Sequence, residues 1–294
     1  MSTSDNVTRL ARRIQRLTGL PLWRSRELAR QVRVFVKYPA PDATTHAQRR
    51  FEAMVVGVLA NAFRDRQRDG AMLGVLFATH DGDGLTLHLH PEMADEAVGE
   101  LLAGWTGARR AVEGVPGVRW SARDGRLVIE SAIFPARITL VRADGAPLWV
   151  PDELPDEIVL VALQSEVAHA SSWDRPDASD VRDLLWSRLL RRPTLLNRAA
   201  AAHGVANCYT HDVVDLVIEW CCGDSVEALL AALLAHGLAD GLADGLAVAH
   251  AAEFYRASAT AMIGGRTVVL RRHGLCDHED SPDAPTSDRA EAVR

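Results

Sequence analysis

The chain has 294 residues, 48% of them hydrophobic and 24% charged, which is enough apolar material for one large core or two small ones. Its longest apolar run, around Glu227 to Leu238, is shorter than a membrane span, and the N-terminal residues lack the continuous apolar segment of a secretory signal. These features argue against a membrane protein, and we expect a cytoplasmic location.

The net charge of -6 is distributed unevenly along the chain. Residues 1–37 hold nine basic and two acidic residues, a local balance of +7, and Lys37 is the only lysine of the protein. Apolar residues recur at helical spacing over 7–18 and again from Leu22 to about Lys37, which predicts a basic helical hairpin. Such a hairpin is a candidate platform for nucleic acid or an acidic protein partner, and the alternative is a solvated amphipathic pair.

A proline-containing linker over 38–45 precedes a predicted long helix from about His46 to Asp69, capped by Thr44 or Thr45. The segment 71–91, AMLGVLFATHDGDGLTLHLHP, then combines an apolar run, a glycine-rich turn and a strictly alternating run. This pattern predicts a β-hairpin that ends at Pro91.

The later elements change in character at Pro151. Before it we expect a helix over 92–113, a hairpin formed by 118–120 and 126–130, and a third hairpin formed by 137–142 and 148–150. After it we expect mainly helices, over 158–170, 177–192, from Pro193, 210–222, 225–236 and 246–261, with 266–272 as a last strand.

This order predicts an α+β fold, with a small mixed or antiparallel sheet and helices followed by an all-helical C-terminal half. The predicted divisions are a basic helical segment and linker (1–45), an α+β core domain (46–151), a helical domain (152–275) and a disordered tail (276–294).

The turn of the first hairpin is the main candidate site. Asp81 and Asp83 are separated by one glycine and followed by another, so the backbone can bring both carboxylates toward one divalent cation. His88 and His90, two residues apart on a strand, form a second pair of metal-competent side chains. The alternative interpretations are an ordinary hairpin turn and a solvated strand face.

The run Thr79-His80-Asp81-Gly82-Asp83-Gly84-Leu85 resembles the T-x-D-x-D-L motif of polymerase-β-type nucleotidyltransferases. Downstream, LPDEIVLVALQSEVA and Ser179-Asp180-Val181-Arg182-Asp183-Leu184 resemble the C-terminal half of AbiEii-type nucleotidyltransferases, the toxins of type IV toxin-antitoxin pairs. The resemblance covers residues 46–192 loosely.

This resemblance implies that Asp81 and Asp83 hold Mg²⁺ against a nucleoside triphosphate, with Asp144 assisting. It also places Asp180 and Asp183 on the helical side of the site, and it puts Gln164 at the position of the family's functional lysine. The implied acceptor is an RNA or a protein, and the basic N-terminus would attract the RNA.

The sequence departs from that family in two ways. The phosphate-binding Gly-Gly or Gly-Ser turn is replaced by DGAMLGVLF, and no lysine follows Lys37. A non-catalytic interaction or scaffold protein on the same fold is therefore the alternative. A second alternative is an HUH-type metal-dependent nuclease using His88 and His90, for which Tyr209 and Tyr255 are the available downstream tyrosines.

Overall fold

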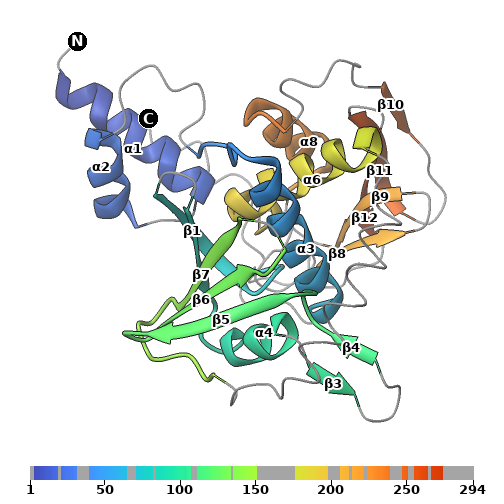
Figure 1. The fold of residues 1–294 in the computed structure, drawn as a ribbon. Helices are drawn as coiled ribbons and strands as arrows, with labels where there is room; N and C mark the ends of the chain where they lie inside the picture. The colour runs from blue at the N-terminus through green and yellow to red at the C-terminus, as the bar shows by residue number, and fades with distance from the viewer. Residues whose placement is uncertain are drawn as a thin grey trace.

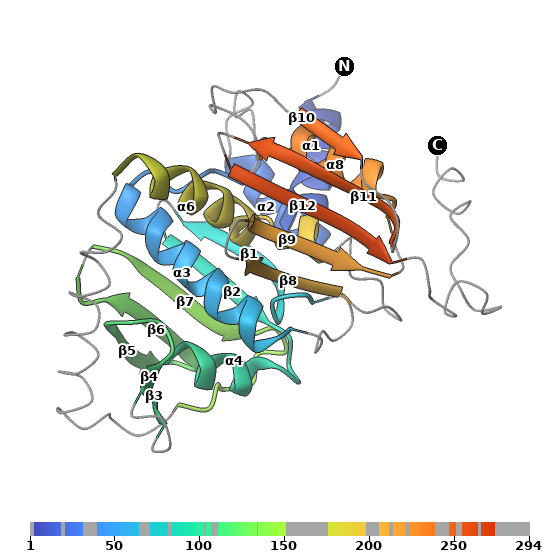
Figure 2. The same ribbon diagram turned by 90° about the vertical axis from the view of Figure 1, so that its right-hand side faces the viewer.

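The computed structural model describes residues 3–18, 21–31, 40–64, 71–81, 84–102, 104–106, 111–133, 135–150, 176–197, 206–211, 214–221, 224–238, 247–250, 255–263 and 266–273 (Figures 1 and 2). In these segments helices accompany two mixed five-stranded sheets, which confirms the α+β class. No helix within these ranges is long and apolar enough to cross a membrane.

The first sheet is preceded by helix α3 (His46–Ala62), whose N-cap Thr45 accepts a hydrogen bond from the Gln48 backbone N–H. Its five strands lie in the order β1-β2-β7-β6-β5. Strands β2 and β7 are parallel, and the other neighbouring strands are antiparallel. The bounds are β1 (Val75–Asp81), β2 (Gly84–Leu89), α4 (Ala94–Leu101), β5 (Val118–Arg123), β6 (Arg126–Ser131) and β7 (Arg137–Arg142).

The second sheet follows helices α6 (Pro176–Arg191) and α7 (Pro193–Asn197). Its strands lie in the order β8-β9-β12-β11-β10, again with one parallel pair, β9 with β12. The bounds are β8 (Ala206–His211), β9 (Val214–Trp220), α8 (Val226–Ala235), β10 (Ala247–His250), β11 (Tyr255–Ile263) and β12 (Arg266–His273).

The two sheets therefore have the same topology: an antiparallel hairpin, a helix, and a three-stranded meander whose last strand returns parallel to the second strand. The chain repeats in sequence as well, because Thr79-His80-Asp81 recurs as Thr210-His211-Asp212, 131 residues later. With the same offset, Glu52 of α3 corresponds to Asp183 of α6, and both side chains are buried. We conclude that the protein contains two copies of one α+β unit.

Helices α3 and α6, the equivalent helices of the two units, pack against each other and make the main contact between them (Figure 1). The inward side of the first sheet is apolar, because alternate residues of β2 point to one face and Leu85, Leu87 and Leu89 are all buried there. These residues and the apolar side chains of the second unit belong to one continuous core.

The basic N-terminal segment forms two helices, α1 (Thr3–Thr18) and α2 (Leu22–Gln31), as predicted for its described residues. Ala11, Ile14 and Ala29 form a small core between the helices, and Phe77 of β1 packs against it. Thr194 of α7 also donates a hydrogen bond to the Arg16 carbonyl at 2.7 Å, so the helical hairpin is attached to both units.

The prediction of an all-helical C-terminal half is wrong, because the described residues between 206 and 273 include five strands. The segment 210–222 is rich in Val and Ile, whose branched β-carbons favour strands, and its apolar residues also fit a helical period. The alanine-rich segment 246–261 has helical propensity, but β11 pairs with β12 and β10 pairs with β11, so much of the segment lies in strands.

Three predictions in the first unit also need correction. The helix expected from His46 to about Asp69 ends at Ala62, with Phe63 as its C-cap. The helix expected over 92–113 ends at Leu101, and the short strands β3 (Gly104–Thr106) and β4 (Ala111–Glu113) follow it. Residues 148–150 do not form a third hairpin, because β7 pairs with β2 and β6 instead. The helix expected over 158–170 and the tail 276–294 lie outside the described residues.

Candidate functional site

The acidic turn lies at one tip of the first sheet. Asp81 is the last residue of β1 and pairs with Gly84, the first residue of β2. Its backbone is therefore fixed by the ladder, whereas its side chain and residues 82–83, including Asp83, lie outside what the structure describes.

Asp144 lies at the opposite end of the same sheet. The Ala143 N–H donates to the Leu89 carbonyl, at the far end of β2 from Gly84. Five strand steps separate Gly84 from Leu89, which amounts to roughly 17 Å. The structure therefore does not bring Asp144 next to the acidic turn.

The Asp144 carboxylate is also engaged locally. It accepts two hydrogen bonds from the Arg142 guanidinium, at 3.2 and 3.1 Å, and one from the Ala146 N–H at 3.1 Å. The hydrogen bond from Arg142 is the main cause that lowers the pKa of this carboxyl. Asp144 thus acts as a turn-forming residue in an ion pair.

The two strand histidines have different neighbours. The ring of His88 stacks on Phe77 with centroids 4.0 Å apart, and its Nε2 lies 3.3 Å from the Thr79 hydroxyl. His90 is buried after the end of β2, where its Nδ1 accepts a hydrogen bond from the Glu92 N–H. Within the described part of the chain, no three His, Cys, Asp or Glu side chains are grouped so that they could hold a metal ion.

The tyrosines considered for an HUH nuclease are both on strands, Tyr209 on β8 and Tyr255 on β11, whereas that mechanism calls for a helical tyrosine. Tyr209 donates a hydrogen bond to Glu219 at 2.8 Å. Burial, followed by this bond to a carboxylate, raises the pKa of Tyr209 to about 12, which opposes its use as a nucleophile.

The candidates on the helical side are only partly described. Asp183 is 1% exposed on α6, in the position equivalent to Glu52, so it faces the protein interior and not a cleft. Asp180 lies on the first half of α6, but its side chain and all of Gln164 are outside the described residues.

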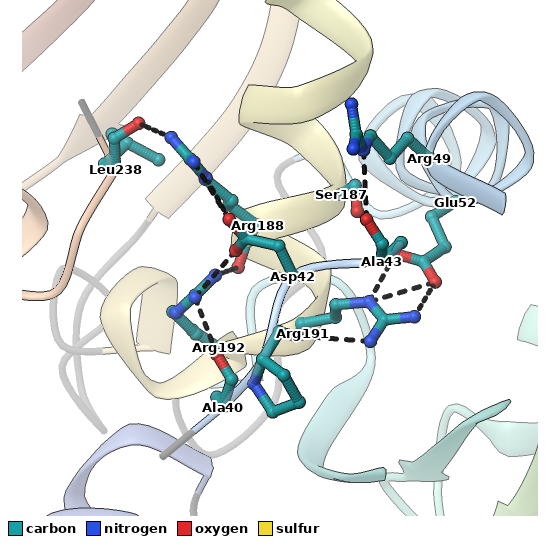
Figure 3. Close-up of polar contacts among 11 residues, drawn as sticks. Ala40, Asp42, Ala43, Arg49, Glu52, Ser187, Arg188, Arg191, Arg192 and Leu238 are labelled. Atoms are coloured by element: carbon teal, nitrogen blue, oxygen red, sulfur yellow. Dashed lines mark hydrogen bonds and ion pairs between the residues drawn. The ribbon is translucent and has the colours of Figure 1, made fainter. Parts of the chain in front are cut away.

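A buried polar cluster joins the two units and was not predicted from the sequence (Figure 3). Arg191 of α6 holds Glu52 of α3 through both its Nε and Nη2 atoms, at 2.6 to 3.1 Å, and both side chains are fully buried. Ser187 and Gln48 donate further hydrogen bonds to the same carboxylate, at 2.6 and 2.8 Å. The charge of Glu52 is therefore fully compensated inside the core.

The neighbouring arginines tie α6 to the segment that leads into α3. Arg188 and Arg192 both hold Asp42, at 2.9 and 2.8 Å (Figure 3). Burial alone would raise the pKa of Asp42, but the hydrogen bond from Arg188 and the charge of Arg192 outweigh it and lower the pKa. These contacts fasten the start of the first unit to the second unit.

His80, inside the Thr-His-Asp motif, lies against this cluster. Burial, followed by the charges of Arg191 and Arg192, lowers the pKa of His80 to about 3, so its imidazole is neutral at pH 7. A hydrogen bond with the Arg191 backbone opposes that shift only in part. The sequence signal that would have revealed this arrangement is the 131-residue repeat, which pairs Glu52 with Asp183 and the two Thr-His-Asp motifs.

Comparison of the chain with models of known protein families, with curated proteins and with solved structures found no significant match.

Proposed function

We propose that this protein is a non-catalytic binding scaffold that holds an anionic macromolecule through its arginine-rich N-terminal hairpin. The observation that carries the proposal is the exposed positive charge of α1 and α2. The exposed arginines are Arg9, Arg12, Arg16, Arg24, Arg26 and Arg30, and Glu27 is the exposed acid among them. None of these six guanidinium groups forms an ion pair with another residue in the described ranges.

The geometry of the hairpin suits a partner that is itself extended and charged. Arg9, Arg12 and Arg16 follow one another on one side of α1, while Ala11 and Ile14 are buried on the other. On α2, Trp23 is 64% exposed and the Arg24 guanidinium lies 5.1 Å from the centre of its ring. An exposed tryptophan among arginines offers a binding partner both apolar area to bury and positive charge to pair with.

Two observations favour a scaffold over an enzyme at the acidic turn. The Thr-His-Asp motif recurs in the second unit, where Val213-Val214-Asp215 replaces Gly82-Asp83-Gly84. Because both hairpins share the Thr-His-Asp pattern, the pattern fits a structural role in the unit. Asp83, the second carboxylate of the turn, is replaced by Val214 in the second unit. In addition, Asp144 is held by Arg142 at the other end of the sheet.

The proposal is tested by removing positive charge from α1. We expect the triple variant Arg9→Gln, Arg12→Gln, Arg16→Gln to weaken binding of a polyanion at least tenfold, because phosphate or carboxylate contacts are lost with each guanidinium. The measurement is fluorescence anisotropy with a labelled oligouridylate and, separately, a labelled polyglutamate peptide.

The matched control lowers the net charge by the same amount at a remote site. Ala228→Glu, Ala231→Glu, Ala235→Glu places three carboxylates on the exposed side of α8. Equal weakening by both triple variants would mean that only net charge matters, and it would refute the hairpin as the binding surface. Failure of the wild-type protein to bind either polyanion would refute the proposed function as a whole.

A second candidate function is Mg²⁺-dependent nucleotide transfer to an RNA or protein acceptor, with Asp81 and Asp83 as the metal ligands. It is supported by the position of Asp81 at a strand end in a mixed sheet, where a turn can present two carboxylates together. A thermal-shift experiment with nucleoside triphosphates and Mg²⁺ tests it. Stabilisation of the wild type that Asp81→Asn abolishes would favour the transferase over the scaffold.

A further inference from the structure

The outward face of the first sheet differs from its apolar inward face. Alternation along β2 places Thr86 and His88 outward, opposite to Leu85 and Leu87. The strand register aligns one row of small or hydroxyl side chains across all five strands. That row consists of Thr79, Thr86, Thr139, Val128 and Ser121, each half-buried or exposed.

The fold does not require this row to be accessible, because the matching row of the second sheet is buried at its first three places. In strand register, the places of the second sheet that match its first three strands hold Tyr209, Val217 and Val269, which are buried and pack together. The corresponding residues of the first sheet are Thr79, Thr86 and Thr139. At these three places the first sheet therefore presents partly accessible hydroxyl groups where the second sheet is closed by packed side chains, which indicates a use of that face.

The next row of the same face carries aromatic and basic groups. His88 stacks on Phe77 at an interplanar angle of 20°, and Arg126 and Arg123 follow on β6 and β5, with Val141 between them and His88. Burial, followed by the charges of Arg24 on α2 and Arg126 on β6, lowers the pKa of His88 to about 4. The arginines of the hairpin and of the sheet thus border one surface.

The carboxylate described on this face is balanced by its neighbours. Glu130 of β6 lies between Arg119 of β5 and Arg137 of β7, its direct cross-strand partners. Arg123 and Arg126 are exposed at the edge of this face, where Arg123 lies 3.7 Å from the Asp124 carboxylate and Arg126 adds a positive charge.

We propose that the outward face of the first sheet, together with α2, binds single-stranded RNA. Bases stack on flat aromatic groups and on guanidinium planes, which His88, Trp23 and Arg24 offer, and phosphates pair with the bordering arginines. The threonine row offers hydroxyl partners for ribose 2′-hydroxyl groups. An acidic peptide would use the arginines but leave the stacked rings and the threonine row without a role.

This inference rests on the proposed function, because it names the polyanion that the hairpin recruits. The test measures anisotropy of a labelled oligouridylate of about twelve nucleotides, a length within the site sizes of such surfaces. We expect Arg126→Gln and Thr139→Glu each to weaken binding roughly tenfold, and His88→Ala to weaken it to a similar extent through loss of stacking. Ala231→Glu on α8 is the matched control for Thr139→Glu and should change the affinity less than about twofold.

The outcomes separate this inference from the function on which it rests. Wild-type affinity in both Arg126→Gln and Thr139→Glu, with weakened binding in the α1 triple variant, would overturn the sheet as the RNA surface and leave the hairpin proposal intact. Equal affinity for oligothymidylate would overturn the assignment to RNA. Binding of polyglutamate without binding of oligouridylate would overturn this inference and point to an acidic protein partner. Thermal melts confirm that each variant is folded, and Arg126→Gln, an exposed position, keeps the test valid if Thr139→Glu fails to fold.

Discussion

Arg191 and Glu52 form a bidentate ion pair in which neither side chain is exposed. This pair connects α6 and α3, the equivalent helices of the two units. Burying such a pair costs desolvation energy that only the partner charge offsets. Removing one partner should therefore destabilise the protein far more than replacing both partners with apolar residues.

We therefore expect Glu52→Ala to lower the free energy of unfolding by about 3–5 kcal/mol, because it leaves the Arg191 charge buried without its carboxylate. The double variant Glu52→Leu, Arg191→Met should recover most of that loss. Urea denaturation of the single and double variants measures both effects. A double variant as unstable as Glu52→Ala would show that packing, and not the unpaired charge, determines the loss.

The two perturbed histidines predict acid sensitivity. The pKa of His80 is about 3 and that of His88 about 4 in the folded protein, against 6.5 for an ordinary histidine. Below pH 6.5 the unfolded chain therefore binds more protons than the folded protein does. The free energy of unfolding decreases as the pH is lowered, by at most about 1.4 kcal/mol per pH unit for each group. The loss from His80 ends near pH 3 and the loss from His88 ends near pH 4.

The pH prediction is checked by denaturation of the wild type and of His80→Asn at several pH values between about 3 and 7. We expect a smaller decline in His80→Asn than in the wild type. An identical pH profile would mean that His80 is not held neutral by its surroundings. Above pH 6.5 the contribution is fully present in the wild type, so the two slopes should agree there.

The proposed RNA binding should depend strongly on salt. If four phosphates are contacted, the affinity should fall by roughly fiftyfold between about 50 and 200 mM salt, because each contact releases a bound counterion. The Arg24→Gln variant should show a shallower dependence on a logarithmic plot. A salt-independent affinity would contradict a surface built from arginines.

The acidic turn distinguishes the scaffold from the transferase. The scaffold proposal predicts that Asp81→Asn together with Asp83→Asn changes oligouridylate affinity by less than about threefold, and in the direction of tighter binding, because two negative charges are removed. A transferase would instead lose nucleotide incorporation in that variant. The measurements are anisotropy for the first and transfer of a radiolabelled nucleotide for the second.

Much of the first unit could be predicted from local patterns. The hairpin at 71–91 follows from its apolar run and its alternating strand, and α3 follows from apolar spacing behind the Thr45 cap. The same method failed for segment 210–222, because its Val and Ile residues fit both a helical and an extended period. Pairing with β8 and β12 decides between the two conformations.

The candidate site shows a different limit. Proximity along the chain gave no guide to the distance between Asp144 and the acidic turn, which depends on the parallel direction of β2 and β7. The cluster around Glu52 joins residues more than 130 positions apart, and its arginines read as an ordinary polar helix face in the sequence. Only the recurrence of Thr-His-Asp could have suggested that the two halves share one plan.

Because both copies of the unit lie in one polypeptide, their amino-acid sequences can differ. A homodimer must present the same residues on both of its halves, so any change that helps one surface is imposed on the other. In this protein Thr86 and Val217 occupy matching places, yet one is open to polar contacts and the other is closed in an apolar patch with Val269. Covalent linkage thus lets the two halves carry different side chains at matching places, with accessible hydroxyl groups on one sheet and apolar packing on the other.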